Sequence, residues 1–141
     1  MAEYRIVKLD SLNTIQQRGL LELFVEADFS DNTVSCSWLD DAVKGSLLAV
    51  AAEDDSGSII GFARVLGDGV SDCYIQDVVV KSSCRRQGIG RKLIEFALAE
   101  LKKRSIDWVG LIATPGNAEF YRRLGFEPMN GFTPMVLKKY E

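Results

Sequence analysis

Histidine is absent from this sequence of 141 residues. Its absence excludes Ser-His-Asp triads, Cys-His dyads and every metal site that needs a histidine ligand. Cysteine is scarce too: Cys36, Cys73 and Cys84 are odd in number and lack the paired spacing of a zinc site. This pattern favours free thiols in a reducing cytoplasm over a disulfide framework. We therefore predict no bound metal, and any chemistry must use Asp, Glu, Tyr, Ser, Cys, Lys or backbone groups.

Long apolar segments are also missing. No run approaches the roughly 18 apolar residues that cross a bilayer. The first ten residues, MAEYRIVKLD, lack the apolar centre of a secretory signal. We expect a cytoplasmic protein with no membrane partner. With 47% hydrophobic and 26% charged residues, and with no repeat or linker, the chain is typical of one globular domain over residues 1–141.

Basic residues are too few for a general nucleic-acid partner, because the net charge is −3. The charge is unevenly spread. Residues 1–70 carry five Lys and Arg against twelve Asp and Glu, whereas residues 71–141 carry twelve against eight. The C-terminal half could therefore hold an anion, and the N-terminal half could tolerate a cation. Solvated surface explains the same asymmetry equally well.

Hydrophobic periodicity and turn-forming residues predict alternating strands and helices. Asp55, Ser56 and Gly57 supply a turn between two apolar runs, which predicts an antiparallel hairpin. Ser37 is the expected cap of a short helix. Strands are expected at 3–9, 46–53, 58–67, 73–80, 107–114, 126–129 and 133–140, and helices at 13–27, 38–44, 88–104 and 115–125. This order is typical of an α/β sandwich with a mixed sheet.

A basic loop that contains two glycines, CRRQGIGRKL, follows the strand residues DVVV and leads into a helix. The first turn of a helix leaves N–H groups unpaired and carries about half a positive charge, which suits an anion. Gly88 and Gly90 let a phosphate approach the backbone, and Arg85, Arg86 and Arg91 add guanidinium groups. The alternative is that the two glycines only make a tight turn.

Two common phosphate-binding motifs do not fit this loop. The dinucleotide motif G-x-G-x-x-G would need a third glycine where Leu93 stands, and the P-loop motif G-x-x-x-x-G-K-[ST] is absent. The pattern that remains is R-x-x-G-x-G, formed by Arg85, Gly88 and Gly90.

The segment VVVKSSCRRQGIGRKLIEFAL resembles the acetyl-CoA signature of the GNAT N-acetyltransferase superfamily, with strand, R-x-x-G-x-G loop and helix in the expected order. FYRRLGF (Phe120–Phe126) resembles the second signature of that family, a tyrosine on a short helix followed by Gly-Phe. The resemblance covers residues 46–139 and is closest in texture to small bacterial members, while QDVVV resembles the EDVVV of glucosamine-6-phosphate N-acetyltransferases. It implies an α/β fold with a mixed, mostly antiparallel central sheet flanked by helices. A splayed central strand pair would form the acetyl-CoA cleft.

The resemblance also implies which residues hold acetyl-CoA. The backbone of Val78, Val79 and Val80 would bind the pantetheine arm as a sheet edge binds an added strand. The N–H of Val79 would polarise the thioester oxygen. The pyrophosphate would lie on the loop residues Arg85, Arg86, Gln87, Gly88, Ile89, Gly90 and Arg91.

The second signature supplies candidates near the sulfur of CoA. Tyr121 would protonate the departing thiolate as a general acid. The alternative is an ordinary helix aromatic that packs against Leu124. Phe120 would be a further cofactor contact. Asn117 would either contact the cofactor or cap the helix.

The acceptor amine must lose a proton before it attacks. An alkylamine with a pKa of about 10.4 is neutral in roughly one molecule in 10³ at pH 7, so a base or a water chain is needed. Asp77 is the candidate base, because a carboxylate inside an apolar strand is costly without a role or a partner. The alternative is a structural Asp77 that bonds the backbone or Arg64. Glu26, Asp28 and Asp31 could attract the amine or could be solvated surface.

The resemblance, together with these candidate residues, implies an acetyl-CoA-dependent N-acetyltransferase that acts on a primary amine of a small molecule by direct attack in a ternary complex. Cys84 lies on the pyrophosphate loop, so a covalent acetyl-cysteine is not expected. The alternatives are a non-catalytic acyl-CoA sensor and a protein-modifying acetyltransferase of the same fold. The segment 133–140 could pair across a homodimer, which is common in the family. The sequence carries no motif that names the acceptor.

Overall fold

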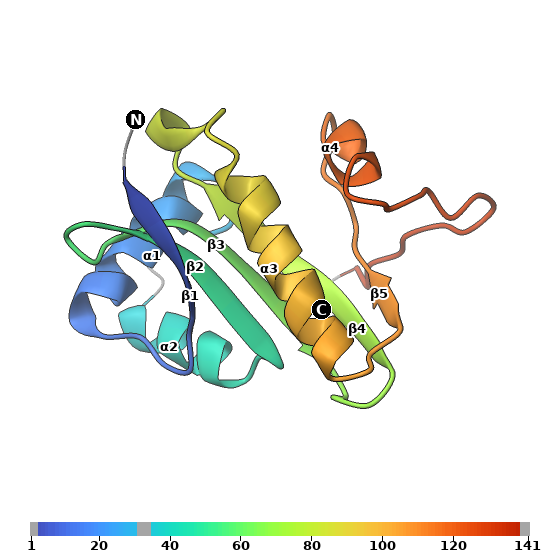
Figure 1. Cartoon of the computed structure of the whole chain (residues 1–141), viewed down its shortest axis with the longest axis horizontal. Helices are drawn as coiled ribbons and strands as arrows, with labels where there is room; N and C mark the ends of the chain where they lie inside the picture. The colour runs from blue at the N-terminus through green and yellow to red at the C-terminus, as the bar shows by residue number, and fades with distance from the viewer. Residues whose placement is uncertain (1–2, 31–34, 139–141) are drawn as a thin grey trace. The chain divides into compact units, whose positions relative to one another are not determined.

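The computed structural model describes residues 3–30 and 35–138, which form two compact units that divide after Leu111 (Figure 1). We call the part up to Leu111 the sheet unit and the part from Ile112 the C-terminal unit, and each is described by itself. The assignment of one domain to residues 1–141 stays a prediction.

Five strands of the described residues form one sheet in the order β1-β2-β3-β4-β5. Neighbouring strands are antiparallel except β4 and β5, which are parallel. The strands are β1 (Tyr4–Lys8), β2 (Leu48–Asp54), β3 (Ile59–Gly67), β4 (Asp72–Val80) and β5 (Trp108–Gly110). The prediction of a mixed, mostly antiparallel sheet is therefore confirmed.

The hairpin of β2 and β3 forms where the turn residues predict it. Asp54 Oδ1 accepts hydrogen bonds from the backbone N–H groups of Ser56 and Ser58, both at 3.0 Å. Gly57 takes a φ of 83°, a conformation that costs glycine little. Local chemistry is thus sufficient for this turn.

Three helices belong to the sheet unit, namely α1 (Thr14–Glu26), α2 (Cys36–Lys44) and α3 (Ile89–Lys103). α1 begins with a capping box in which Asn13 and Gln16 exchange side-chain-to-backbone bonds. The predicted cap of α2 is wrong: Ser35, not Ser37, accepts the N–H of Trp38, at 3.2 Å. Ser37 already lies inside the first turn, where its side chain cannot take the cap position.

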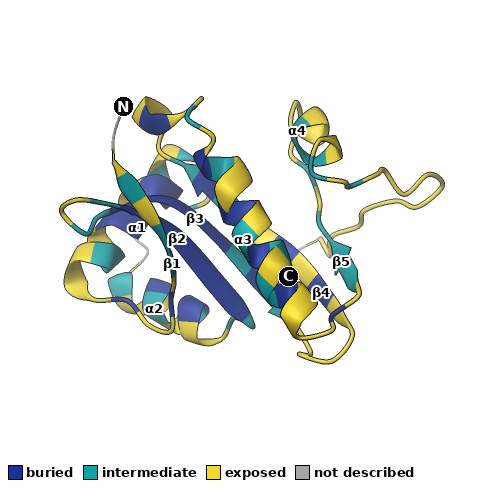
Figure 2. Cartoon of the chain, viewed as in Figure 1, coloured by how far each residue is buried: buried dark blue, intermediate teal, exposed yellow. Residues whose placement is uncertain are grey.

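Helices cover both faces of the central strands, so β2 is buried along almost its whole length (Figure 2). Phe62 on β3 belongs to the core cluster formed with α1 and α2. The preceding residue, Gly61, lies under α3, where a Cβ atom would meet Ile89 Cγ2 at 2.9 Å and Leu93 Cδ1 at 3.1 Å. Because successive strand residues point to opposite faces, α3 lies on the face opposite α1 and α2 (Figure 1).

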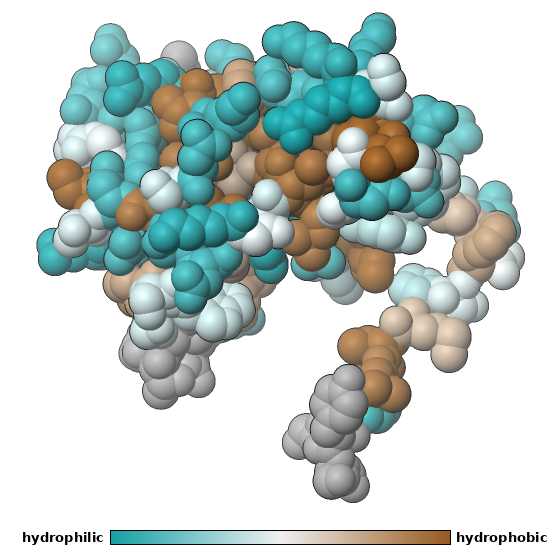
Figure 3. Space-filling model, turned by 90° about the horizontal axis from the view of Figure 1, so that it is seen from below, coloured by the Kyte–Doolittle hydropathy of each residue, from teal (hydrophilic) through white to brown (hydrophobic). Residues whose placement is uncertain are grey.

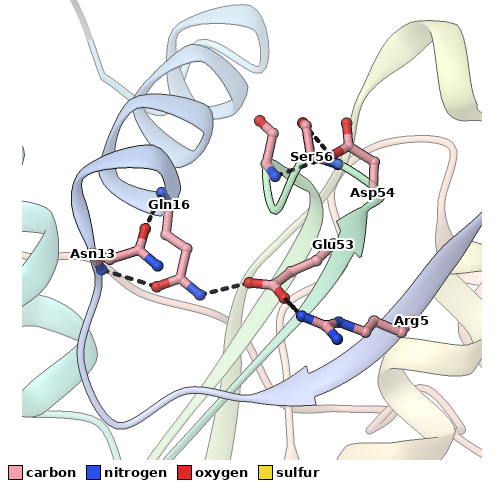
Figure 4. A network of polar contacts seen from close by, with 7 residues as sticks. Arg5, Asn13, Gln16, Glu53, Asp54 and Ser56 are labelled. Atoms are coloured by element: carbon pink, nitrogen blue, oxygen red, sulfur yellow. Dashed lines mark hydrogen bonds and ion pairs between the residues drawn. The ribbon is translucent and has the colours of Figure 1, made fainter.

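A buried carboxylate joins three elements at one side of the sheet (Figure 4). Glu53 on β2 is only 5% exposed. It accepts hydrogen bonds from Arg5 Nη2 on β1 at 3.2 Å and from Gln16 Nε2 on α1 at 2.5 Å. A charge at this depth is costly unless it is paired, so the network fixes α1 against β1 and β2.

β5 is shorter than the strand predicted at 107–114. It pairs with β4 only over Asp72 to Tyr74, opposite Trp108 to Gly110. Within the described part of the sheet unit, β4 continues to Val80 with no partner strand on that edge. β4 and β5 therefore form a pair that separates after three residues, the arrangement that a splayed pair requires.

The C-terminal unit contains the predicted short helix, α4 (Ala118–Arg122). The strands predicted at 126–129 and 133–140 are not found among its described residues, which end at Lys138. Hydrophobic side chains of this segment lie on the surface (Figure 3), and Met135 is 89% exposed. Residues with high strand propensity form a strand only when a neighbouring strand takes up their peptide groups, and propensity does not supply that neighbour.

Candidate functional site

A β-bulge interrupts β4 at the start of its open edge. Opposite the single residue Ala63 of β3 lie two residues of β4, Asp77 and Val78. Asp77 takes a left-handed conformation with a φ of 56°, which Asp tolerates better than most residues. A bulge bends the strand and re-aims its peptide groups. β4 therefore changes direction a few residues beyond Tyr74, the last residue that pairs with β5.

The peptide groups of Val78 and Val80 face the open edge of β4. Lys81 N–H donates to the carbonyl of Ile60 at 2.8 Å, so these two residues form a hydrogen-bonded pair of the ladder. Bonded and non-bonded pairs alternate along an antiparallel ladder, so Val79, two residues before Lys81, also directs its peptide groups toward β3. Val78 and Val80 direct theirs away from β3. The open edge thus presents donors and acceptors at every second residue.

The loop after β4 ends at an uncapped helix N-terminus. Gly88 is the N-cap of α3, has a φ of 77°, and provides no side-chain cap. The first helical bond runs from Lys92 N–H to the Gly88 carbonyl at 3.0 Å. The N–H groups of Ile89, Gly90 and Arg91 therefore have no acceptor inside the helix, and they form the positive end of its dipole. This arrangement suits an anion such as a phosphate.

Three arginines flank this N-terminus along the chain. Arg85, Arg86 and Arg91 are exposed, and Arg86 takes a φ of 65°. Arg85 Nε donates to the carbonyl of Val80 at 3.4 Å, and Arg91 forms an i,i+4 ion pair with Glu95 at 3.4 Å. In the adjoining turn, the Oε1 atom of Gln87 is buried and lacks a hydrogen-bond partner among the described residues. The three predicted cationic side chains of the loop are thus at the surface, and Arg91 is paired with Glu95.

Asp77 has a partner. Its Oδ2 atom lies 2.6 Å from Arg64 Nε on β3, and the same guanidinium reaches the carbonyl of Ala42 on α2 at 3.5 Å. This contact gives Asp77 a structural reason to lie in an apolar strand. It agrees with the alternative to a catalytic base, a structural Asp77 that bonds Arg64.

The acidic residues of the N-terminal half differ in their surroundings. Both carboxylate oxygens of Glu26 accept hydrogen bonds from Ser82. These bonds hold the pKa of Glu26 below its usual value. Asp28 is exposed with a φ of 59°. Asp31 lies outside the described residues.

The C-terminal unit holds the residues of the second signature. Tyr121 on α4 packs edge-on against Phe120 and Phe126, with ring centroids 5.0 and 5.9 Å apart. Burial raises the pKa of the Tyr121 phenol, so the group keeps its proton at neutral pH. Asn117 stands at the N-cap of α4 but makes no capping bond, and its Nδ2 donates to Thr114 Oγ1 at 2.6 Å.

The three cysteines are free thiols, and Cys73 and Cys84 are buried. Burial raises the pKa of the Cys73 thiol, which lowers its reactivity. Over residues 3–30 and 35–138, no three His, Cys, Asp or Glu side chains converge into a group that could hold a metal. No helix of the same residues is long and apolar enough to cross a membrane.

Comparison with known proteins identifies the family of this chain. Residues 44–128 match the model of the acetyltransferase (GNAT) domain. Over 99% of its length the chain also matches a GNAT family acetyltransferase from Streptococcus pneumoniae, with 30% identity, complete coverage of that protein and a TM-score of 0.80. The chain belongs to the GNAT acetyltransferase family.

Two further relatives carry specific names. Serotonin N-acetyltransferase 2, chloroplastic, from Oryza sativa subsp. japonica is 37% identical over 89 residues, 63% of this chain. The chain spans only 40% of the length of that protein. Glucosamine-6-phosphate N-acetyltransferase from Arabidopsis thaliana shares the fold, with a TM-score of 0.71, 20% identity and 98% coverage of both chains.

Sequence reasoning missed one contact at this site, between Glu26 and Ser82. The two residues lie 56 positions apart, and no motif links them. Within the sequence, the only signal was an acidic residue at the end of a predicted helix, which also fits solvated surface.

Proposed function

We propose that this protein is an N-acetyltransferase that moves the acetyl group of acetyl-CoA to a primary amine of a small molecule. One observation carries the proposal: the open edge of β4, beyond its bulge, runs into the uncapped N-terminus of α3. An extended arm with amide groups fits a strand edge, and a pyrophosphate fits a helix N-terminus. Acetyl-CoA, the donor that the family uses, has both parts in this order.

In this proposal the peptide groups of Val78 and Val80 bind the pantetheine arm. The amides of the loop that ends at Arg91 hold the pyrophosphate, and Arg85 and Arg86 neutralise it. Phe120 and Asn117 are proposed as additional cofactor contacts on the family resemblance. The Asn117 amide would then exchange its bond to Thr114 for one to the cofactor.

The chemistry is direct transfer in a ternary complex. The neutral amine nitrogen attacks the thioester carbonyl carbon, and a backbone N–H stabilises the negative charge on the carbonyl oxygen. We assign this donor to Val78 in place of Val79, because the ladder directs the Val79 peptide toward β3. The carbon–sulfur bond then breaks and, as the family resemblance implies, the thiolate takes a proton from the Tyr121 phenol. The attacking nitrogen gives up its extra proton, which restores the phenol and leaves the neutral amide.

The proton of the incoming ammonium needs an acceptor before attack. Asp77 as the base remains one proposal, because only its Oδ2 atom is bonded to Arg64. The second proposal is that a chain of water molecules accepts this proton, and that Asp77 only fixes the bulge of β4. The contact with Arg64 favours the second proposal, because it already engages one carboxylate oxygen of Asp77 and ties the side chain to β3.

The amine class is best sought among arylalkylamines first. The rice relative is named for serotonin, and near the N-terminal helices of this chain two aromatic side chains are exposed, Phe29 at 41% and Trp38 at 51%. Such surfaces suit an aromatic amine. A non-catalytic acyl-CoA sensor and a protein-modifying acetyltransferase remain the alternative functions.

A thiol-release assay tests the proposal with acetyl-CoA and a panel of arylalkylamines, polyamines, amino acids, aminoglycosides and amino sugars, glucosamine 6-phosphate included. Turnover of one amine class supports the enzyme. Acetyl-CoA binding in calorimetry without turnover of any amine favours the sensor, and acetylation of a protein substrate favours the third function. Failure to bind acetyl-CoA contradicts all three.

A cytoplasmic location and a homodimer belong to the same proposal. The free thiols support the first, and the exposed hydrophobic segment before Lys138 supports the second. Two tests apply: localisation of the tagged protein in its native cell, and its mass in solution by light scattering.

A further inference from the structure

The last residue of α1 holds the first residue of the turn that leads to the basic loop. Glu26 Oε1 accepts the backbone N–H of Ser82 at 2.7 Å, and Glu26 Oε2 accepts the Ser82 hydroxyl at 2.9 Å. Ser82 opens the 3-10 turn η1 (Ser82–Cys84), which connects β4 to the loop. The residue at the N-cap of this turn, Lys81, makes no side-chain cap. Glu26 therefore supplies from a distant helix the cap that the local sequence lacks.

The turn is held on three sides. Lys81 N–H bonds to the carbonyl of Ile60 on β3 at 2.8 Å, and Cys84, at its far end, is only 8% exposed. The bond to Glu26 is the third restraint, and it is the one made by a charged group. The chain leaves this turn at Arg85, so the restraints on η1 set the direction in which the loop begins.

The negative charge of Glu26 opposes the binding of an anion to the nearby loop, so any benefit to cofactor binding must come from the contact with Ser82. Its pKa is lowered first by the bonds to Ser82 and further by Arg85 and Lys81, so the carboxylate is ionised at neutral pH. A negative charge beside an anion-binding loop repels a phosphate. A residue that acted through its charge alone would therefore weaken cofactor binding.

We propose that Glu26 is a positioning residue for the acetyl-CoA loop: it caps η1 through Ser82 and so orders the chain from Arg85 to Arg91 for the cofactor. The inference rests on the proposed function, because it assigns the loop to acetyl-CoA. Ordering the loop before binding removes part of the entropy cost of association.

Calorimetry with acetyl-CoA tests the proposal in the full chain. Glu26→Ala should raise the Kd about tenfold, and Ser82→Ala, which keeps the backbone N–H, about threefold. The double variant should resemble Glu26→Ala alone, because the two changes remove one contact. Glu22→Ala is the matched control: it removes the same charge from an exposed position of α1 and should leave the Kd unchanged.

Kinetics separate positioning from general damage. If Glu26 positions the loop, KM for acetyl-CoA rises in Glu26→Ala while kcat and KM for the amine stay the same. Glu26→Gln should fall between wild type and Glu26→Ala, because the amide oxygen can still accept one bond. Tighter binding by Glu26→Gln and Glu26→Ala alike, a Kd change equal to that of Glu22→Ala, or additive effects of Glu26→Ala and Ser82→Ala would each overturn the proposal.

Hydrogen exchange distinguishes this inference from the proposed function. Without any ligand, Glu26→Ala should speed the exchange of amides in residues 82–91 and leave those of β2 and β3 unchanged. Unchanged exchange in 82–91 refutes the ordering role even if acetyl-CoA binds. Faster exchange in a protein that does not bind acetyl-CoA would leave the ordering intact and refute only the assignment of the loop to that cofactor.

Discussion

Arg64 Nε lies 2.6 Å from Asp77 Oδ2 and joins β3 to the bulge of β4. The side chains are 16% and 24% exposed, so water screens the pair only in part. Through Nη1 the guanidinium also reaches the carbonyl of Ala42, which links α2 to the same bulge. The bulge on the open edge of β4 is thus fixed by charge as well as by backbone pairing.

Asp77→Asn and Arg64→Gln should each lower the free energy of unfolding by about 1–3 kcal/mol, the usual effect of losing a hydrogen bond between charged groups. Asn keeps the tolerance for a left-handed backbone, so the loss reports on the ion pair. The double variant should lose little more than either single variant, because both changes break one interaction. Urea denaturation measures all three.

Activity of the same variants separates the two roles of Asp77. If the pair is structural, Asp77→Asn and Arg64→Gln should lower kcat to a similar, small extent. If Asp77→Asn alone lowers kcat by about 10² or more while Arg64→Gln remains active, Asp77 is the base after all.

Tyr121→Phe should lower kcat by about 10²–10⁴, the range for loss of a general acid, with little change in KM for acetyl-CoA. Phe keeps the packing against Phe120 and Phe126, so the variant removes only the hydroxyl. Phe126→Leu is the control for packing, because Phe126 contacts the Tyr121 ring and has no proposed role at the site. A Tyr121→Phe enzyme with full kcat would leave Tyr121 the role of an ordinary helix aromatic.

The pKa of Tyr121, raised by burial, predicts how stability depends on pH. The folded state favours the neutral phenol of Tyr121. The resulting contribution to the free energy of unfolding is fully present below the usual tyrosine pKa of about 10 and is lost as pH rises through the raised pKa. Wild type should therefore lose more stability than Tyr121→Phe on this alkaline limb. Circular dichroism of both proteins in urea, at matched pH values, makes the comparison, and parallel curves would contradict it.

Gly61→Val should displace the first turns of α3, because even a Cβ atom at this position would lie 2.9 Å from Ile89. We expect a loss of about 1–3 kcal/mol in stability, as in overpacked cores. The Kd for acetyl-CoA should rise as well, since the N-terminus of α3 moves.

Gly57→Ala is the control for Gly61→Val. It strains a backbone with a φ of 83° but meets no atom within 4 Å, and it lies in the turn between β2 and β3. It should lower the melting temperature and leave the Kd unchanged. An unchanged Kd in Gly61→Val would show that α3 adjusts without moving its N-terminus.

The thiols should react at different rates with an alkylating reagent. Cys36 is partly exposed and should react first, whereas Cys73 and Cys84 are 0% and 8% exposed and should react slowly. Bound acetyl-CoA should slow Cys84 further, because Cys84 adjoins Arg85, the first arginine proposed to hold the pyrophosphate. Mass spectrometry of the labelled peptides follows each site, with Cys36→Ser to remove the fast signal, and a Cys84 rate that saturating acetyl-CoA leaves unchanged would count against the proposed loop.

Local patterns were enough to predict the hairpin around Gly57, the helix that opens after Gly88 and the basic loop between β4 and α3. Each depends on interactions within a few residues, such as turn bonds, helix termini and side-chain alternation, which a sequence pattern records directly. The family resemblance rests on the same local signals. For that reason the fold class could be predicted from the sequence alone, and the basic loop could be named as a candidate for the cofactor.

Contacts between distant residues were decided only by the tertiary structure. Arg64 meets Asp77 across 13 positions, and Glu26 meets Ser82 across 56. The segment 133–138 has the pattern of a strand and is not one, because a strand needs a partner as well as a propensity. A sequence lists which groups are available, whereas the free energy of a charge or a strand edge depends on which group the folded chain brings beside it.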